Sequence, residues 1–208
     1  IVPVAVFPSG PLVVGVPEKL GINTYRELVA HARKNDINMG SYAPGSYPQM
    51  VADQTNRSEG TKIVTINYKG ESPMWIDVAS GQIQVAIGSF QAFNTVASRG
   101  VKAIGVTGSY RSPKLPDVPT LVEQGIPGRL VQLEGGLPLM APVGTPEAVL
   151  HALNQVAVEG ANTAGAARMR ETFAIPNKPK NLAETRADWE RDVPLWVKLA
   201  VDLGIKLD

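Results

Sequence analysis

Residues 37–107 read INMGSYAPGSYPQMVADQTNRSEGTKIVTINYKGESPMWIDVASGQIQVAIGSFQAFNTVASRGVKAIGVT and alternate short apolar runs with segments of helical character. The apolar runs predict strands at Ile37–Ser41, Lys62–Tyr68, Ile83–Ile87 and Lys102–Thr107. The segments between them predict helices at Tyr47–Asn56, Met74–Ala79 and Phe90–Arg99. Repeated strand–helix alternation within so short a stretch is typical of an α/β fold with a largely parallel sheet.

The flanking segments extend this pattern. Leu12–Val16 lies between two prolines and predicts a buried strand. Thr24 begins a capping-box pattern, T-x-x-E, which opens a helix that is expected to reach Lys34. After a proline-rich loop, we expect a short helix at Thr120–Gln124 and an extended stretch at Leu130–Met140.

The C-terminal third is expected to be mainly helical. One helix should begin with Thr145 as N-cap and Pro146 at its first position, and a second should cover Thr163–Phe173. A further capping box, Asn181–Glu184, opens the last helix. Because Pro194 removes a backbone donor inside that helix, we expect a kink or break near the preceding turn, at Asp192.

The composition excludes several functional classes. The 208 residues carry 20 Lys and Arg against 19 Asp and Glu, with a formal net charge of +1 and no clustered basic face. Binding to nucleic acid is therefore not expected, since phosphate neutralisation needs clustered cations. The absence of cysteine excludes disulfides and thiolate metal sites. No apolar run reaches the roughly 18 residues of a membrane-spanning helix.

Two strand-to-helix loops share one design. In Gly45–Pro48 (GSYP) and Gly70–Pro73 (GESP), a glycine frees the backbone and a serine with a proline starts a helix. Ser46 and Ser72 are expected N-caps, so amide donors stay free at two positive helix ends. Such loops lie at the carboxyl edge of a parallel sheet, where Gly88–Ser89 adds a third turn. The pattern predicts a carboxylate or phosphate cradle, although simple helix capping would produce the same residues.

The sequence contains no motif typical of a catalytic or metal site. The stretch Gly40–Ser46 lacks the lysine of a P-loop, and no G-x-S-x-G elbow occurs. His31 and His151 lie far apart on expected helices, without a partner at metal-ligand spacing. Glu71 is expected to be a solvated carboxylate rather than a general base. We therefore predict no catalytic residue, no metal and no cofactor.

Three blocks of the sequence resemble those of the tripartite tricarboxylate transporter receptors, the TctC-like Bug proteins. The first is Tyr68–Pro73 (YKGESP), which is followed by Asp77 and by Ser80–Ile83 (SGQI). The others are Arg111–Thr120 (RSPKLPDVPT) and Ala141–Pro146 (APVGTP). Together the YKG and RSP blocks are specific, and the similarity covers nearly the whole chain.

The resemblance implies a fold like that of type II periplasmic binding proteins, with two α/β lobes, mainly parallel sheets and a ligand cleft. Residues 1–10 would form a hinge and a first-lobe strand, and residues 11–132 the second lobe with its ligand-binding loops. Residues 133–208 would form a crossover strand and C-terminal helices that return to the first lobe. A preceding stretch would build much of that first lobe.

The resemblance also implies a function. The protein would be a periplasmic solute-binding receptor, and not an enzyme, which captures small organic carboxylates: di- or tricarboxylates or aromatic acids. It would deliver them to the membrane permease subunits of the transporter, and the signal peptide would lie outside this chain. The expected ligand-binding residues lie in the loops named above and are Ser41, Tyr42, Gly45, Ser46, Tyr47, Gln49, Gly70, Glu71, Ser72, Pro73, Gly88 and Ser89.

Some residues depart from the family pattern. The family often has His at the position of Gln49, Asp at Gln84 and Asp-Asn at Gly88–Ser89. Loss of the Asp at Gly88 favours a carboxylate ligand without an amino group. Two other functions stay open at this point: the ligand-sensing domain of a regulator, which would need a helix-turn-helix segment elsewhere, and a hydrolase.

Overall fold

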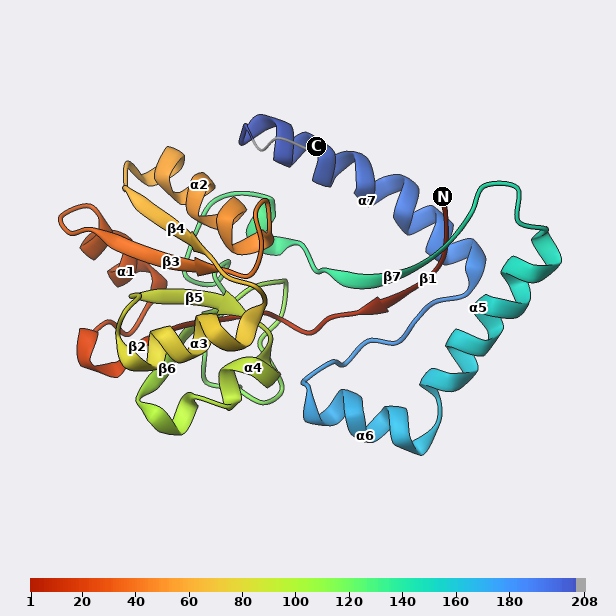
Figure 1. Ribbon diagram of the computed structural model, residues 1–208, viewed down its shortest axis with the longest axis horizontal. Helices are drawn as coiled ribbons and strands as arrows, with labels where there is room; N and C mark the ends of the chain where they lie inside the picture. Colours follow the sequence, from red (N-terminus) through yellow and green to blue (C-terminus); the bar gives the residue numbers. More distant parts are fainter. Residues whose placement is uncertain (205–208) are drawn as a thin grey trace. The chain divides into compact units, whose positions relative to one another are not determined.

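The structure is a computed structural model that describes residues 1–204, so the last residues of the predicted C-terminal part lie outside it. The chain divides into two compact units (Figure 1). The smaller unit consists of Ile1–Gly10 and Glu134–Leu199, and the larger unit consists of Pro11–Leu133 together with residues 200–204. The correspondence of these units to receptor lobes stays a prediction.

The larger unit is built on a five-stranded sheet with the order β4-β3-β5-β2-β6. Its strands are β2 (Val13–Pro17), β3 (Ile37–Ser41), β4 (Ile63–Asn67), β5 (Val85–Gly88) and β6 (Val101–Val106). β3 is parallel to both β4 and β5, whereas β2 runs antiparallel to its neighbours β5 and β6. The predicted α/β class with a mainly parallel sheet is confirmed, with one reversed strand that the sequence pattern did not indicate.

The helices of the larger unit follow local capping signals. They are α1 (Tyr25–Ala32), α2 (Tyr47–Glu59), α3 (Glu71–Ser80) and α4 (Phe90–Asn94), with 3-10 turns η1 (Glu18–Leu20), η2 (Ala97–Arg99) and η3 (Leu130–Gln132). The Thr24 hydroxyl accepts a hydrogen bond of 3.1 Å from the Glu27 amide, as predicted. Two predictions were wrong: Phe90–Arg99 splits into α4 and η2, and Thr120–Gln124 forms turns instead of a helix.

Trp75 anchors the core on the face of the sheet covered by α3 and α4. Its side chain is fully buried and contacts Phe93 edge to face, with 5.6 Å between the ring centroids. A Cβ atom at Gly15 of β2 would come within 2.6 Å of the indole. The indole therefore packs directly on the backbone of the sheet, which explains why β2 carries a glycine at this point.

The smaller unit combines a strand pair with three helices. β1 (Val2–Pro8) and β7 (Gly136–Ala141) are antiparallel. The helices are α5 (Glu147–Ala161), α6 (Ala164–Thr172) and α7 (Leu182–Asp202), of which the part up to Leu199 belongs to this unit. The buried Asn154 on α5 donates to the carbonyl oxygens of Val4, at 2.8 Å, and Lys180, at 3.1 Å. This side chain therefore fastens α5 to β1 and to the segment that enters α7.

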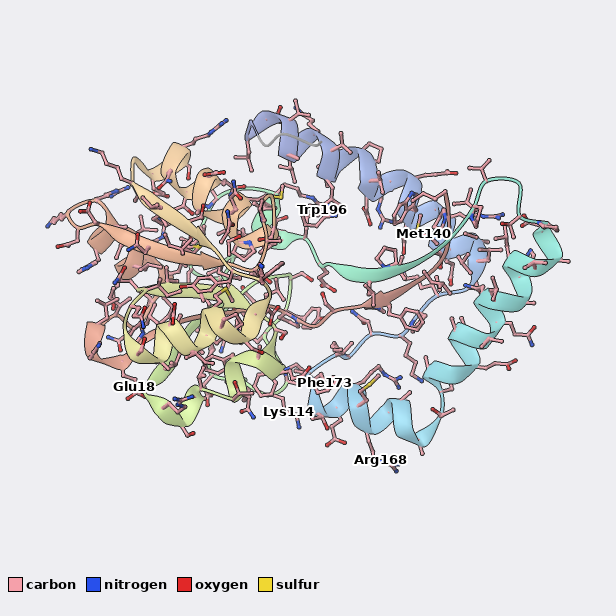
Figure 2. The ribbon with its side chains drawn as sticks, viewed as in Figure 1. Glu18, Lys114, Met140, Arg168, Phe173 and Trp196 are labelled. Atoms are coloured by element: carbon pink, nitrogen blue, oxygen red, sulfur yellow. The ribbon has the colours of Figure 1, made fainter. Side chains whose placement is uncertain are left out.

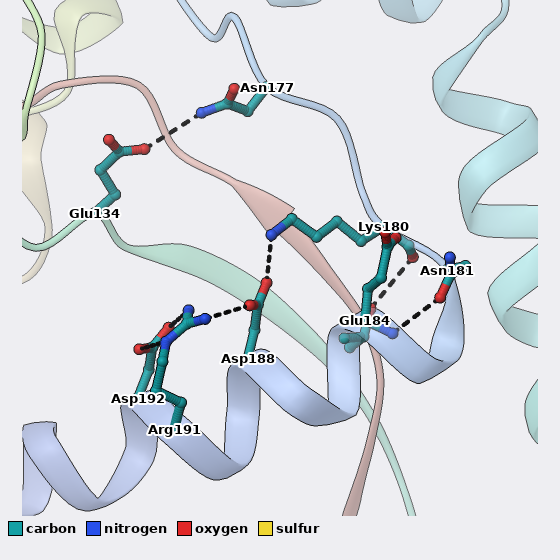
Figure 3. Close-up of polar contacts among 9 residues, drawn as sticks. Glu134, Asn177, Lys180, Asn181, Glu184, Asp188, Arg191 and Asp192 are labelled. Carbon is teal, nitrogen blue, oxygen red and sulfur yellow. Dashed lines mark hydrogen bonds and ion pairs between the residues drawn. The ribbon is translucent and has the colours of Figure 1, made fainter.

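The start of α7 is held by polar contacts (Figure 3). The Glu184 amide donates to the Asn181 side chain at 2.9 Å, which confirms the predicted N-cap. Lys180 and Arg191 both form ion pairs with Asp188, at 2.6 and 2.9 Å. The helix continues through Pro194, so the expected break near Asp192 does not occur.

The start of α5 differs from the prediction. Pro146 is the N-cap with an extended ψ of 139°, and Thr145 stands one residue outside. The Thr145 hydroxyl donates instead to the Pro142 carbonyl oxygen at 2.8 Å. The proline at this position therefore fixes the entry into the helix without a side-chain cap.

No helix within residues 1–204 has both the length and the apolar character needed to cross a bilayer.

Candidate functional site

Three strand-to-helix junctions of the larger unit hold all of the predicted ligand-binding residues. The first junction, residues 41–49, joins β3 to α2; the second, residues 67–73, joins β4 to α3; the third, residues 88–89, joins β5 to α4. β3 and β4 pair in register from Ile37↔Ile63 to Ser41↔Asn67, so their carboxyl ends lie side by side. The first two junctions are also linked directly, since the Gly70 amide donates to the Tyr42 carbonyl oxygen at 3.3 Å.

The first junction is closed largely by its own residues. Ser46 takes the N-cap position of α2, but its hydroxyl contacts the hydroxyl of the buried Ser41 at 2.7 Å instead of a helix amide. The Ser46 amide donates to the Ala43 carbonyl oxygen at 3.2 Å, and the Gly45 amide to Gln49 Oε1 at 2.9 Å. Two expected anion donors are therefore occupied. The Gln49 amide, in the first turn, has no partner among the described residues.

The second junction is arranged differently. Gly70, not Ser72, is the N-cap of α3, with φ 100° and ψ 178°. Ser72 and Pro73 therefore occupy the second and third helical positions, which corrects the prediction of Ser72 as N-cap and Pro73 as the first helical residue. Within residues 1–204 the backbone amides of Glu71 and Ser72 have no hydrogen-bond partner. These two donors are available at the positive end of a ten-residue helix.

The third junction is bound by a residue of the second. Ser89 is the N-cap of α4, and its hydroxyl accepts from the Ala92 amide at 3.3 Å. Its own amide and hydroxyl both donate to Glu71 Oε2, at 3.0 and 2.6 Å. The expectation that Glu71 is merely solvated was therefore wrong: the half-buried carboxylate links α3 to α4.

Two tyrosines line the first junction. Burial, and to a lesser extent the charge of Glu71, raises the pKa of Tyr42 to about 12. Burial also raises the pKa of Tyr47, whose hydroxyl donates to the Leu130 carbonyl oxygen at 3.0 Å. Both hydroxyls are therefore neutral near pH 7. The charge of Glu71, in the second junction, is therefore close enough to act on the Tyr42 hydroxyl in the first.

One polar group at this edge was missed by the sequence analysis. The indole Nε1 of Trp75 is buried and has no hydrogen-bond partner among the described residues. A Cβ atom at Gly88 would lie 2.9 Å from this nitrogen and 3.1 Å from Glu71 Oε2. No sequence signal could have found this contact, because it depends on how α3 packs against β5.

The remaining candidates lie outside the junctions. Gln84 Oε1 accepts from the Asn38 amide at 2.9 Å and so extends the contact between β3 and β5. His151 is exposed, and its Nε2 lies 3.4 Å from Glu147 Oε1. His31 Nδ1 contacts the side-chain amide of Asn35. In the described part of the chain, no three His, Asp or Glu side chains gather as they would around a metal ion.

The family of the chain follows from comparison with known sequences. The model of the tripartite tricarboxylate transporter family receptor, TctC, matches residues 1–175. The chain belongs to this family. Among TctC relatives, the UPF0065 protein in the tcbD-tcbE intergenic region of Pseudomonas sp. strain P51 is 30% identical over 210 residues, which cover 97% of this chain and 60% of that protein. Protein BugT of Bordetella pertussis is 26% identical over 213 residues, which cover all of this chain and 64% of BugT.

The chain thus spans less than two thirds of the length of these curated TctC relatives. Solved structures agree with the fold. Rpa4515 of R. palustris with adipate superposes with a TM-score of 0.84 at 26% identity, covering 98% of this chain and 69% of that one. The periplasmic binding protein BugD gives a TM-score of 0.80 at 23% identity, with coverage of 98% and 69%. These likenesses confirm the predicted TctC-like receptor fold.

Proposed function

We propose that the protein is a periplasmic receptor that captures small organic carboxylates and delivers them to the permease subunits of a tripartite transporter. Family membership supports receptor function, and the bound adipate of Rpa4515, a relative at 26% identity, supports a carboxylate as ligand. Di- or tricarboxylates and aromatic acids are the ligand classes that we propose, and the protein performs no catalysis in this role.

The single observation that carries the proposal is the pair of open amides at the start of α3. In the described part of the chain, the N–H groups of Glu71 and Ser72 have no hydrogen-bond partners, and they lie at the carboxyl edge of the sheet, where α/β proteins bind ligands. The Gln49 amide of α2 offers a third donor on the adjoining junction. A carboxylate that accepts such bonds gains about 1.5–3 kcal/mol from each charge-assisted contact.

The proposal is tested by removing one amide. Ser72→Pro deletes the N–H at the second position of α3, and proline is compatible with the φ angle of a first helical turn. Calorimetric titration with adipate should then show an affinity at least about tenfold lower than that of the unchanged protein, which is the loss of one charge-assisted bond.

Ala148→Pro is the matched control, because Ala148 is the second residue of α5 in the smaller unit. This variant should bind adipate as the unchanged protein does. Equal affinities of the Ser72→Pro variant and the unchanged protein would refute the role of the α3 amides. Absence of binding to any member of a panel of mono-, di- and tricarboxylates would refute the proposed function.

A further inference from the structure

A fixed negative charge stands inside the proposed ligand site. Glu71 lies in the second junction, and one of its oxygens, Oε2, accepts both hydrogen bonds from Ser89. Within residues 1–204 this carboxylate forms no ion pair, and its other oxygen, Oε1, has no hydrogen-bond partner. The charge is therefore half-buried without a compensating cation, and one of its oxygens remains free to accept a hydrogen bond.

The position of this carboxylate is set by packing. A side chain at residue 88 would have to occupy the space taken by the Glu71 carboxylate and the Trp75 indole, whose atoms lie 2.9–3.1 Å from an ideal Cβ. Gly88 is buried. The glycine therefore makes room for the Glu71 carboxylate, and the two bonds from Ser89 hold it there.

The same corner contains an unsatisfied donor. The Trp75 indole N–H is buried next to Gly88 and has no acceptor within residues 1–204. Buried polar groups are nearly always hydrogen-bonded, so an exception indicates a place where a polar group is received or where bonds rearrange. The corner formed by Glu71, Trp75 and Gly88 thus has the features of a binding subsite and not those of a closed structural contact.

Charge decides which ligands suit this corner. A carboxylate bound to the α3 amides is repelled by the Glu71 side chain, and the repulsion grows with each further negative charge on the ligand. A hydroxyl or similar donor on the ligand would instead be able to pair with Glu71 Oε1. Building on the proposed function and narrowing its ligand classes, we propose that Glu71 is a specificity-determining residue that selects singly charged carboxylates carrying a hydrogen-bond donor over di- and tricarboxylates.

Three acids with the same six-carbon chain test this selection: hexanoate, 6-hydroxyhexanoate and adipate. Their dissociation constants are measured by calorimetry for the unchanged protein and for Glu71→Gln. The glutamine keeps an oxygen that can accept from Ser89 but removes the charge. We expect the unchanged protein to bind 6-hydroxyhexanoate most tightly, and Glu71→Gln to shift the ratio of adipate to hexanoate affinity at least about fivefold toward adipate.

Glu18→Gln is the matched control. Glu18 follows β2 and is exposed, and its amide pairs with Gly100 at the start of β6, which is the sheet edge opposite the junctions (Figure 2). The same change of charge there should leave the affinity ratio unaltered. If circular dichroism shows that Glu71→Gln is unfolded, Glu71→Ala makes the same charge change and replaces it.

The outcomes separate the two proposals. If the unchanged protein binds these acids but prefers adipate, or if the ratio moves less than about fivefold in the Glu71 variant, the role of Glu71 is refuted and carboxylate binding stands. If Glu18→Gln moves the ratio equally, the effect is one of net charge and the role of Glu71 is likewise refuted. If the unchanged protein binds none of the three acids, both the role of Glu71 and the proposed binding of such carboxylates are refuted.

Discussion

The first and second junctions are nearly alike in sequence and unlike in structure. In the first, serine follows glycine directly, and Ser46 becomes the N-cap while Gly45 and Ser46 bond within their own loop. In the second, Glu71 stands between the glycine and the serine, and Gly70 becomes the N-cap. The amides of Glu71 and Ser72 then stay open. A displacement of one residue therefore separates a junction that closes on itself from one that can receive a ligand.

The largest expected effect concerns the backbone of Gly70. Its φ of 100° with ψ of 178° is a region that only glycine occupies readily, so Gly70→Ala should lower the free energy of unfolding by about 3 kcal/mol. Gly60 ends α2 with a φ of 66°, and Gly60→Ala should lower the free energy of unfolding by only about 1 kcal/mol. In neither variant would the new Cβ lie within 4 Å of another atom. The difference between their unfolding free energies, measured by chemical denaturation, therefore reflects backbone strain and not steric contact. Equal costs would show that the second junction does not depend on its glycine.

The two serines should differ by a smaller amount. Ser46→Ala removes one of the two partners of the buried Ser41 hydroxyl, which also donates to the Ala43 carbonyl oxygen, and should lower the free energy of unfolding by about 1 kcal/mol. Ser72→Ala removes a side chain without a hydrogen bond among the described residues, so its effect should stay within about 0.5 kcal/mol. Urea unfolding of both variants provides the measurement. If Ser72→Ala lowers the free energy of unfolding by more than Ser46→Ala does, Ser72 acts as a helix cap after all.

The smallest effect is the electrostatic link between the junctions. The pKa of Tyr42 is raised from 10.0 to about 12, so its contribution to stability is complete below pH 10 and is lost as the pH rises through 12. Tyr42→Phe should therefore reduce the fall in unfolding free energy over this interval. Glu71→Gln should lower the pKa of Tyr42 only in part, because burial is the larger cause.

The ultraviolet absorbance of tyrosinate follows this titration, with Tyr42→Phe identifying the contribution of Tyr42. This identification is needed because the pKa values of Tyr25 and Tyr68 are also raised to about 12. An unchanged Tyr42 midpoint in Glu71→Gln would mean that the two junctions are electrostatically independent.

Local signals in the sequence were sufficient for most elements of the fold. Thr24 and Asn181 each cap the helix that their spacing predicted, since a cap needs only a side chain and an amide three residues away. The prediction of a break at Pro194 was wrong, because α7 continues through the proline. The reversed direction of β2 was not predictable, since an apolar run has no indicated direction.

The candidate site was predictable only in outline. The sequence placed the three junctions at one edge because parallel strands end together. It could not show that Gln49 binds the Gly45 amide, or that Glu71 binds Ser89 eighteen positions away. Such contacts depend on the relative placement of strands and helices. The roles of the twelve predicted ligand-binding residues stay predictions until a ligand is bound.

The buried indole of Trp75 gives the protein a built-in optical reporter. Trp75 is the only tryptophan of residues 11–133; Trp189 and Trp196 belong to α7. Replacing these two by phenylalanine leaves one tryptophan, which is buried next to Gly88 and has no hydrogen bond among the described residues to shift its emission to the red. Spectral changes on titration with a solute would then arise at the junctions themselves, without any attached dye.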